Sequence, residues 1–316
     1  MLASELPLVS IVIPCFKQAQ YLPDAIESCL GQTYPNIDIY VVNDGSPDNT
    51  SEVANRYPDR VRLIEQQNSG VNAARNAGIL ISAGEFVAFV DADDVLHPTC
   101  IEERMKPLIE DPSVGSVSGW YRLVDPQLKP LPDEQQLWDT PDLRKRDVFI
   151  REMWSSTCGY VVRRRAIEVC GPFDPMIVIA EDWDLQMRLA RKYRHAYIAK
   201  RLADYRQVGT SASRNYQLMF DCIRQVVRKN RAYAPSRIAY ILTGFLAQFT
   251  QVSGSVFAKI LREPANESRW KVLGRLFVKR PSSIYLFFLW ILKGIVNRCL
   301  RIFGLKKQPL RSLPTE

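Results

Sequence analysis

The chain has 316 residues, of which 47% are hydrophobic and 24% are charged. This is the balance of an ordinary globular protein, and it excludes a chain that is disordered throughout or collagen-like. At roughly 100–200 residues per domain, the length predicts either one large domain with a smaller addition or two domains.

The formal net charge of +8 is unevenly distributed along the chain. Residues 1–213 carry 23 basic and 30 acidic side chains, a net of −7, whereas residues 214–316 carry 19 basic and 4 acidic ones, a net of +15. A basic surface attracts polyanions such as nucleic acid or an anionic membrane leaflet. The shift predicts a first domain over 1–212 and a basic region over 213–316.

The cysteines and histidines exclude several kinds of site. The seven cysteines are odd in number and form no CxxC pair, which argues against a secreted disulfide framework and a thiolate zinc site. His97 and His195 are the only histidines, so a histidine-rich metal site is excluded. We expect His97 to be structural and His195 to lie at the surface. The first ten residues do not have the pattern of a signal peptide, which favours a reducing cytoplasm.

Short apolar, β-branched runs alternate with helical patterns over the first 210 residues, which predicts βαβ units and a mostly parallel sheet. Pro14 is expected to end the first strand, and Gly31 to end the first helix. A loop rich in Pro, Asp and Gln follows over 125–147. The expected strands are 8–13, 37–42, 61–64, 85–90, 161–162 and 196–205, and the expected helices are 23–30, 71–81 and 182–191.

The C-terminal region is helical and apolar in pattern. Residues 238–258 are uncharged and long enough to span a bilayer, but polar for that role. Residues 284–292 are all apolar, and a basic amphipathic pattern follows over 293–303, as in helices that lie at a membrane surface. Interfacial membrane binding is one interpretation. Packing on the first domain or on a second subunit is another, and a membrane span is a third.

In a parallel sheet, ligands bind beyond the carboxyl ends of the strands. Asp91, Asp93 and Asp94 follow one predicted strand directly, and three carboxylates so close together repel one another unless solvent or a cation intervenes. Oxygen ligands of this kind suit Mg²⁺ or Mn²⁺. The alternative is a solvated acidic turn before the next helix.

Two further polar segments follow predicted strands. Asp44 ends the second strand, where a carboxylate can accept a hydrogen bond from a nucleobase; its Asp-Gly-Ser sequence also suits a simple turn. The segment 67–76 places amides, among them Asn68, and Arg75 at the start of a helix, where they can face a diphosphate. The alternative for this segment is N-capping by Asn68 or Ser69.

Glu181, Asp182, Trp183 and Asp184 begin another predicted helix. Paired carboxylates beside a large aromatic residue are candidates for a general base. The alternative is the favourable placement of acids at a helix N-terminus, worth about 0.3–1 kcal/mol.

Three segments together resemble glycosyltransferase family 2, whose members have the GT-A fold, over roughly residues 7–213. They are VSIVIPCFKQAQYLPDAIESCLGQTYPNIDIYVVNDGSPDNT, NSGVNAARNAGILISAGEFVAFVDADD and EDWDLQMRLA. The resemblance implies an α/β, Rossmann-like, mixed and mostly parallel sheet flanked by helices. In this chain a helical C-terminal extension would follow it.

The resemblance also implies an inverting transfer of a sugar from a nucleotide-diphosphate donor, usually a UDP-sugar. Asp182 would be the general base, with Glu181 and Trp183 on the acceptor side. Asp93 would be the more direct ligand of Mg²⁺ or Mn²⁺, with Asp91 nearer the ribose. The donor-nucleotide pocket would include Pro14, Phe16, Asp44, Asn68, Arg75 and Asp91.

One position departs from the pattern of the family. Many relatives have a histidine near the metal and the pyrophosphate in a YRxHxxS segment, where this chain has Val208. Valine cannot bind a metal, so water, Arg206 or Ser211 would have to compensate, and metal dependence is less firmly implied than the fold.

Three functions follow as hypotheses. The first is a cytoplasmic transferase of polysaccharide or cell-envelope biosynthesis, held at the inner face of the membrane by its C-terminal helices and acting on a glycan or lipid-linked acceptor. The second is an inactive nucleotide-sugar-binding scaffold at the membrane surface. The third is a nucleic-acid binder, which is disfavoured because aromatic and basic residues do not alternate in the basic region.

Overall fold

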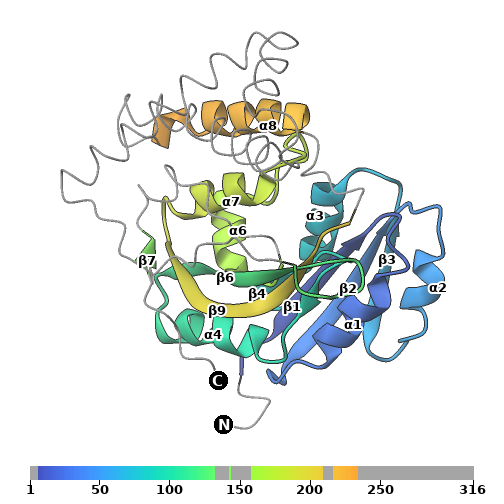
Figure 1. The fold of residues 1–316 in the computed structure, drawn as a ribbon. Coiled ribbons are helices and arrows are strands. Elements are labelled where there is room, and N and C mark those ends of the chain that lie inside the picture. Colours follow the sequence, from blue (N-terminus) through green and yellow to red (C-terminus); the bar gives the residue numbers. More distant parts are fainter. Residues whose placement is uncertain (1–5, 132–141, 144–157, 209–215, 234–316) are drawn as a thin grey trace, which may run out of the picture. The chain divides into compact units, whose positions relative to one another are not determined.

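The computed structural model describes residues 6–131, 142–143, 158–208 and 216–233. The first half of the described chain forms four parallel strands in the spatial order β3-β2-β1-β4 (Figure 1). Their apolar runs are nearly continuous because both faces of the sheet are covered. The strands are β1 (Val9–Cys15), β2 (Ile37–Asp44), β3 (Val61–Gln66) and β4 (Phe86–Phe89).

Strand β1 continues through Pro14 to Cys15, so the expectation that Pro14 ends it is wrong. The reason lies in the pairing of the two neighbouring strands. The pairing with β4 stops at Val12, whereas β2 pairs with β1 as far as Cys15. On the β4 side, proline's missing N–H therefore leaves no ladder bond unmade.

The second half of the sheet is mixed. β8 (Tyr160–Arg163) runs antiparallel to β4, and β6 (Val114–Val124) runs antiparallel to β8. β9 (Arg194–Arg206) then pairs with β6 in parallel. Two short strands, β5 (Val95–Leu96) and β7 (Asp142–Leu143), run antiparallel to β9. The predicted α/β fold with a mixed sheet is confirmed, although β6 was not expected from the sequence.

Helices cover both faces of the sheet, and side chains of β1 alternate between the two cores. Ile11 and Ile13 pack with α1, α2 and α4, whereas Val12 packs with α3, α6 and α7. The helices are α1 (Leu22–Leu30), α2 (Thr50–Ala54), α3 (Val71–Ile81), α4 (Cys100–Glu110), α6 (Arg164–Cys170), α7 (Glu181–Leu189) and α8 (Tyr216–Lys229), with a 3₁₀ turn at Arg231–Tyr233.

His195 is buried, so the expectation of a surface histidine is wrong. Its Nδ1 lies 2.8 Å from Ser116 Oγ and its Nε2 lies 2.8 Å from Ser118 Oγ, both on the adjacent strand β6. Burial lowers the pKa of His195 to about 4. The two serines satisfy a neutral imidazole, because a hydroxyl can donate to one ring nitrogen and accept from the other.

Helix α8 follows the boundary predicted at 212 and is joined to α7 by hydrogen bonds. The predicted apolar and amphipathic segments over 238–303 lie outside the described residues, and the boundary itself stays a prediction. Within the described ranges, no helix is both long and apolar enough to cross a membrane.

Candidate active site

Four loops meet where the parallel strands β1 to β4 end. The backbone N–H of Lys17, after β1, donates to Ser46 Oγ after β2 at 2.8 Å. Gln18 Nε2 donates to Asp93 Oδ2 after β4 at 3.1 Å. These bonds connect the β1 loop to both of its neighbours and place the predicted donor residues along one edge of the sheet.

Asp44 organises the turn that leads into α3. Its carboxylate accepts hydrogen bonds from Gln66 Nε2 at 2.7 Å and from the backbone N–H groups of Ser69 and Gly70, each at 2.9 Å. The helix begins after Gly70, whose φ of 88° is in the left-handed region, and no side chain caps it. Neither alternative of N-capping by Asn68 or Ser69 is therefore observed, and Asn68 is exposed. Contact of Asp44 with a nucleobase stays a prediction.

Asp48 is a structural carboxylate that the sequence did not indicate. It accepts from the backbone N–H of Ala19 at 3.0 Å and from the hydroxyls of Ser46 and Thr50. Burial raises the pKa of Asp48, but these hydrogen bonds outweigh burial and lower it overall. Asp48 thereby fixes the loop that carries Phe16. The sequence signal that could have indicated this role is the position of Asp48 two residues before Thr50, the first residue of α2, because Asp side chains bond to nearby backbone and hydroxyl groups.

Pro14 and Phe16 occupy the end of β1 and the start of its loop. Pro14 is buried, whereas Phe16 is 40% exposed. Lys17 Nζ lies 5.1 Å from the centre of the Phe16 ring, and Lys17 has a φ of 57°. Phe16 thus presents an exposed aromatic ring directly after β1, which suits the predicted nucleotide pocket.

The loop after β4 contains Asp91, Asp93 and Asp94 and is called the acidic loop below. The three carboxylates differ in their surroundings. Burial, and then the charge of Asp91, raises the pKa of Asp93 to about 6. Burial and both neighbouring carboxylates raise the pKa of Asp94 well above its usual range. Asp94 accepts the backbone N–H of Arg206 at 3.0 Å and is buried, so it fixes the end of β9. Asp91 and Asp93 are the more accessible pair.

Arg75 connects the acidic loop to the start of α7. Its Nη2 lies 2.6 Å from Asp91 Oδ1, and its Nη1 lies 2.7 Å from Glu181 Oε1. The side chain is 2% exposed, and its guanidinium also lies 5.3 Å from the centre of the Phe173 ring. Burial lowers the pKa of Arg75, but the charges of Asp91 and Glu181 outweigh it, so the pKa is raised. The structure therefore joins two predicted site segments that are 106 residues apart.

The loop before α7 is held by the same face of α3. Asn72 Nδ2 donates to the carbonyls of Asp174 and Ile177, and Asn76 exchanges two hydrogen bonds with the backbone of Phe173. The loop ends at Ala180, whose φ of 64° and ψ of 27° are left-handed. Backbone strain of this kind is concentrated at functional sites.

Asp182 is half-buried in the first turn of α7, and its Oδ1 accepts the backbone N–H of Trp183 at 2.8 Å. Trp183 is buried, so any effect on an acceptor would act through the placement of the helix. Asp184, in contrast, points into the protein and pairs with Arg188 Nε at 2.9 Å. Of the acids at this helix start, Glu181 and Asp182 are the ones left near the surface.

Val208 departs from the family's pattern, whereas Arg206 fits it, and Ser211 lies outside the described residues. Val208 is buried. Arg206 Nη2 lies 2.7 Å from Asp24 Oδ2, and its guanidinium lies 4.6 Å from the centre of the Tyr21 ring. The charge of Arg206 acts to lower the pKa of Asp93, so the chain places a fixed cation near the acidic loop. His97, at 3.1 Å from Asp204 Oδ1, contributes to a separate cluster with Arg122.

The acidic loop fits a divalent cation chemically. Burial, and then the charge of Asp91, raises the pKa of Asp93, and a bound cation would favour its ionised form. Among the residues that the structure describes, no three His, Cys, Asp or Glu side chains form a metal-binding group. Mg²⁺ commonly takes only one or two carboxylates and fills its remaining positions with water and substrate phosphates.

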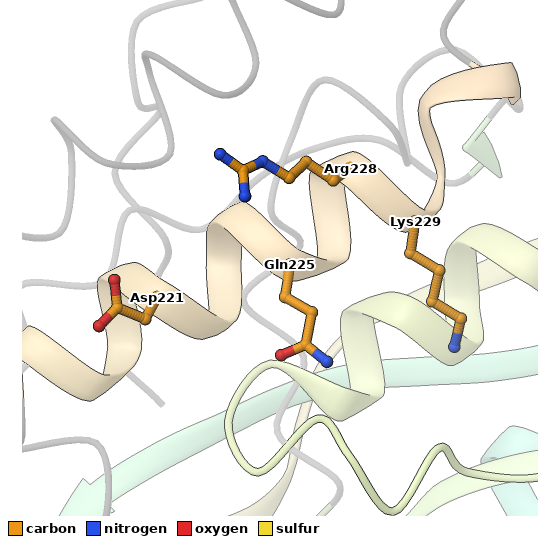
Figure 2. Close-up of a pocket in the computed structure, with 4 residues that line it drawn as sticks. All are labelled: Asp221, Gln225, Arg228 and Lys229. Atoms are coloured by element: carbon orange, nitrogen blue, oxygen red, sulfur yellow. The ribbon is translucent and has the colours of Figure 1, made fainter.

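An open pocket lies elsewhere, along α8 (Figure 2). The described residues that line it are Asp221, Gln225, Arg228 and Lys229, and none of them is a predicted site residue. The meeting point of the four loops is therefore the candidate active site on chemical grounds, because the carboxylates are gathered there.

Comparison with known proteins gives matches over the same region. The family model for glycosyl transferase family 2 matches residues 10–169. The chain is 32% identical over 194 residues to glycosyltransferase RP339 of Rickettsia prowazekii, covering 58% of this chain and 59% of that protein. It is 29% identical over 296 residues to glycosyltransferase YibD of Escherichia coli K12, covering 85% and 84%. A 124-residue match to the chondroitin synthase of Pasteurella multocida is 36% identical and covers 38% and 13%. Across four Rickettsia relatives the matched region spans 31–59% of their length.

Two solved structures resemble the chain in fold. S. aureus TarS 1-349 has a TM-score of 0.61 at 18% identity, covering 84% of this chain and 79% of that one. The mannosyltransferase PcManGT from Pyrobaculum calidifontis, solved with GDP-Man and Mn²⁺, has a TM-score of 0.60 at 18% identity, covering 90% and 84%. The predicted GT-A fold is confirmed by these likenesses.

Proposed function

The chain belongs to glycosyl transferase family 2, and we propose that it transfers a sugar, with inversion, from a nucleotide-diphosphate donor to an acceptor hydroxyl. The observation that carries the proposal is the Arg75 bridge, which joins Asp91 of the acidic loop to Glu181 beside the candidate base. It brings the donor motif and the acceptor motif into one buried network. A TarS structure with UDP-GlcNAc and the PcManGT complex with GDP-Man support a nucleotide sugar as the donor class. UDP is the nucleotide we propose.

Asp182 is the proposed general base. It takes the proton from an acceptor hydroxyl as that oxygen attacks the anomeric carbon on the face opposite the leaving nucleotide. Its place in the first turn of α7 favours the carboxylate, since negative groups are stabilised at a helix N-terminus. Glu181, fixed by Arg75, holds that turn against the acidic loop. In this proposal, the contacts of Arg75 hold both the acidic loop and the turn that carries the base, and such positioning accelerates a displacement.

Asp93 and Asp91 are the residues that would hold Mg²⁺ or Mn²⁺. A bound divalent cation supplies electrostatic stabilisation of the charge that develops on the leaving nucleoside diphosphate. The Mn²⁺ in the PcManGT complex supports this assignment at the level of the fold. Arg206 is a second source of positive charge at the same loop.

The acceptor we propose is a glycan or lipid-linked hydroxyl in polysaccharide or cell-envelope biosynthesis, with the basic region over 213–316 resting on an anionic membrane surface. The net charge of +15 over 214–316 supports the second part. We expect the protein to co-sediment with anionic vesicles at low salt and to lose this binding at high salt. We expect no comparable binding to duplex DNA. Equal binding to DNA would contradict it.

A nucleotide-release assay tests the transferase. Wild-type protein is incubated with UDP-, dTDP- and GDP-sugars, with Mg²⁺, Mn²⁺ or EDTA. We expect release from a UDP-sugar that stops with EDTA and in Asp93→Ala and Asp182→Asn. Asp59→Asn, at an exposed position, is the matched control and should retain wild-type activity. No release and no nucleotide-sugar binding by calorimetry would refute the proposal in favour of a scaffold.

A further inference from the structure

The end of α8 forms ion pairs with residues on both sides of Asp182, the candidate base. Lys229 Nζ lies 2.7 Å from Asp174 Oδ2, in the loop before α7, and 2.9 Å from Asp184 Oδ2, within α7. Asp182 lies between these two acids in the chain. Figure 2 shows Lys229 and Gln225 pointing to one side of α8 and Arg228 pointing to the other.

On the helix side, the anchor is a fully buried carboxylate. Asp184 accepts hydrogen bonds from Lys229 and from Asn230 Nδ2, each at 2.9 Å, in addition to its pair with Arg188. A buried carboxylate is stable only when its lone pairs are satisfied by donors. Among the described residues, Lys229 at the end of α8 and Asn230 directly after it donate to Asp184, so the buried carboxylate depends on this segment for its hydrogen bonds.

On the loop side, α3 and α8 both form hydrogen bonds with the segment 174–177, which precedes α7. Asn72 Nδ2 donates to the Asp174 carbonyl at 3.1 Å, while Lys229 holds the Asp174 side chain. Gln225 Nε2 donates to the Met176 carbonyl at 3.3 Å. Lys229 lowers the pKa of Asp174, as expected for an ion pair. The segment leads directly into the left-handed Ala180, and then into Glu181 and Asp182.

We propose that Lys229 is a positioning residue for the transfer reaction: by bridging Asp174 and Asp184, it fixes the backbone on both sides of Asp182. This inference rests on the proposed role of Asp182 as the base. The strained Ala180 makes such bracing necessary, because a left-handed alanine persists only where its surroundings determine it. Helix α8 is then part of the catalytic unit.

The test compares three full-length variants with the wild type. Lys229→Met removes the bridge and keeps most of the apolar stem, whereas Lys229→Arg keeps a cation that can reach two carboxylates. Arg228→Met is the matched control, because it removes one positive charge from the adjacent, exposed position. In Lys229→Met we expect kcat to fall about 10- to 100-fold, the effect of small misplacements of a catalytic group. The donor KM should change by less than about twofold, and Lys229→Arg should recover most of kcat.

Hydrogen–deuterium exchange of the backbone over 172–182 is the second measurement. It should rise in Lys229→Met and remain at the wild-type level in Arg228→Met. If the wild type turns over, and Lys229→Met matches Arg228→Met in both kcat and exchange, the inference is overturned while the transferase assignment stands. A wild type that releases nucleotide from no donor overturns the proposed function, and this inference with it.

Discussion

Replacing Arg75 by Met should be among the most destabilising single substitutions in the candidate site. The change retains the apolar stem against Phe173 but removes the cation between Asp91 and Glu181. The two carboxylates stay in place, with side chains that are only 27% and 14% exposed. Each would then have to find water or take up a proton.

The magnitude follows from that burial. Breaking a buried ion pair by removing one partner costs about 3–5 kcal/mol. Because Asp91 retains some access to water, we expect the lower part of this range, about 3 kcal/mol, for Arg75→Met. Whole domains are stable by about 5–15 kcal/mol, so the variant should still fold but lose a large part of its margin.

A double-mutant cycle isolates the bridge itself. Glu181→Gln alone exchanges a charge-assisted hydrogen bond for a neutral one, at a cost of about 1 kcal/mol. The double variant should lose about 1–2 kcal/mol less than the sum of the two single variants, since one uncompensated charge has been removed. Urea unfolding, followed by tryptophan fluorescence and circular dichroism, measures all four proteins. A loss below about 1 kcal/mol for Arg75→Met, or strict additivity, would refute the reasoning.

Two further predictions concern stability. Burial lowers the pKa of His195 from 6.5 to about 4, so between these values the unfolded chain binds the proton and the folded one does not. The burial of His195 should therefore lower the free energy of unfolding by about 3 kcal/mol as pH drops from 7 to 4. His195→Gln should flatten the pH dependence of the urea midpoint. An unchanged slope would contradict a buried, neutral His195. Ala180→Gly removes left-handed strain of about 1–2 kcal/mol but loosens the unfolded chain by about 0.4–1 kcal/mol. The free energy of unfolding should stay level or rise by up to about 1.6 kcal/mol, and a clear loss would argue against strain at φ 64°.

The parallel half of the sheet could be predicted because its signal is local. Runs such as 37–42 and 85–90 are apolar enough to indicate buried strands, and the predicted helix over 71–81 has the observed bounds. β6 could not be predicted in the same way. Its first residues include Gly115, which packs against Tyr193, and Ser116, which is satisfied by His195. Those partners are distant in the chain, so the segment looks polar and weak when taken alone.

In the candidate site, too, features that depend on local sequence could be predicted, whereas contacts between distant segments could not. Residue type and position after a strand identified Asp44, Asp91 and Asp93, because the carboxyl ends of parallel strands share an edge. The sequence did not indicate that Arg75 pairs with Glu181. The role of Asp184 could have been inferred in part, since Arg188 stands four residues later on the same helix. Its contact with Lys229, 45 residues away, could not.

The α3 face that carries Asn72, Arg75 and Asn76 has a consequence for exchange of parts between related enzymes. It is the seam between an N-terminal half that supplies the acidic loop and a later segment, 172–182, that supplies the candidate base. A chimaera that imports a foreign 158–230 segment onto this N-terminal half should fold and work only if the import offers an acid to Arg75 and backbone carbonyls to the two asparagines. Exchange of the segment that carries the candidate base is therefore limited by this seam, where three side chains of α3 must find matching partners.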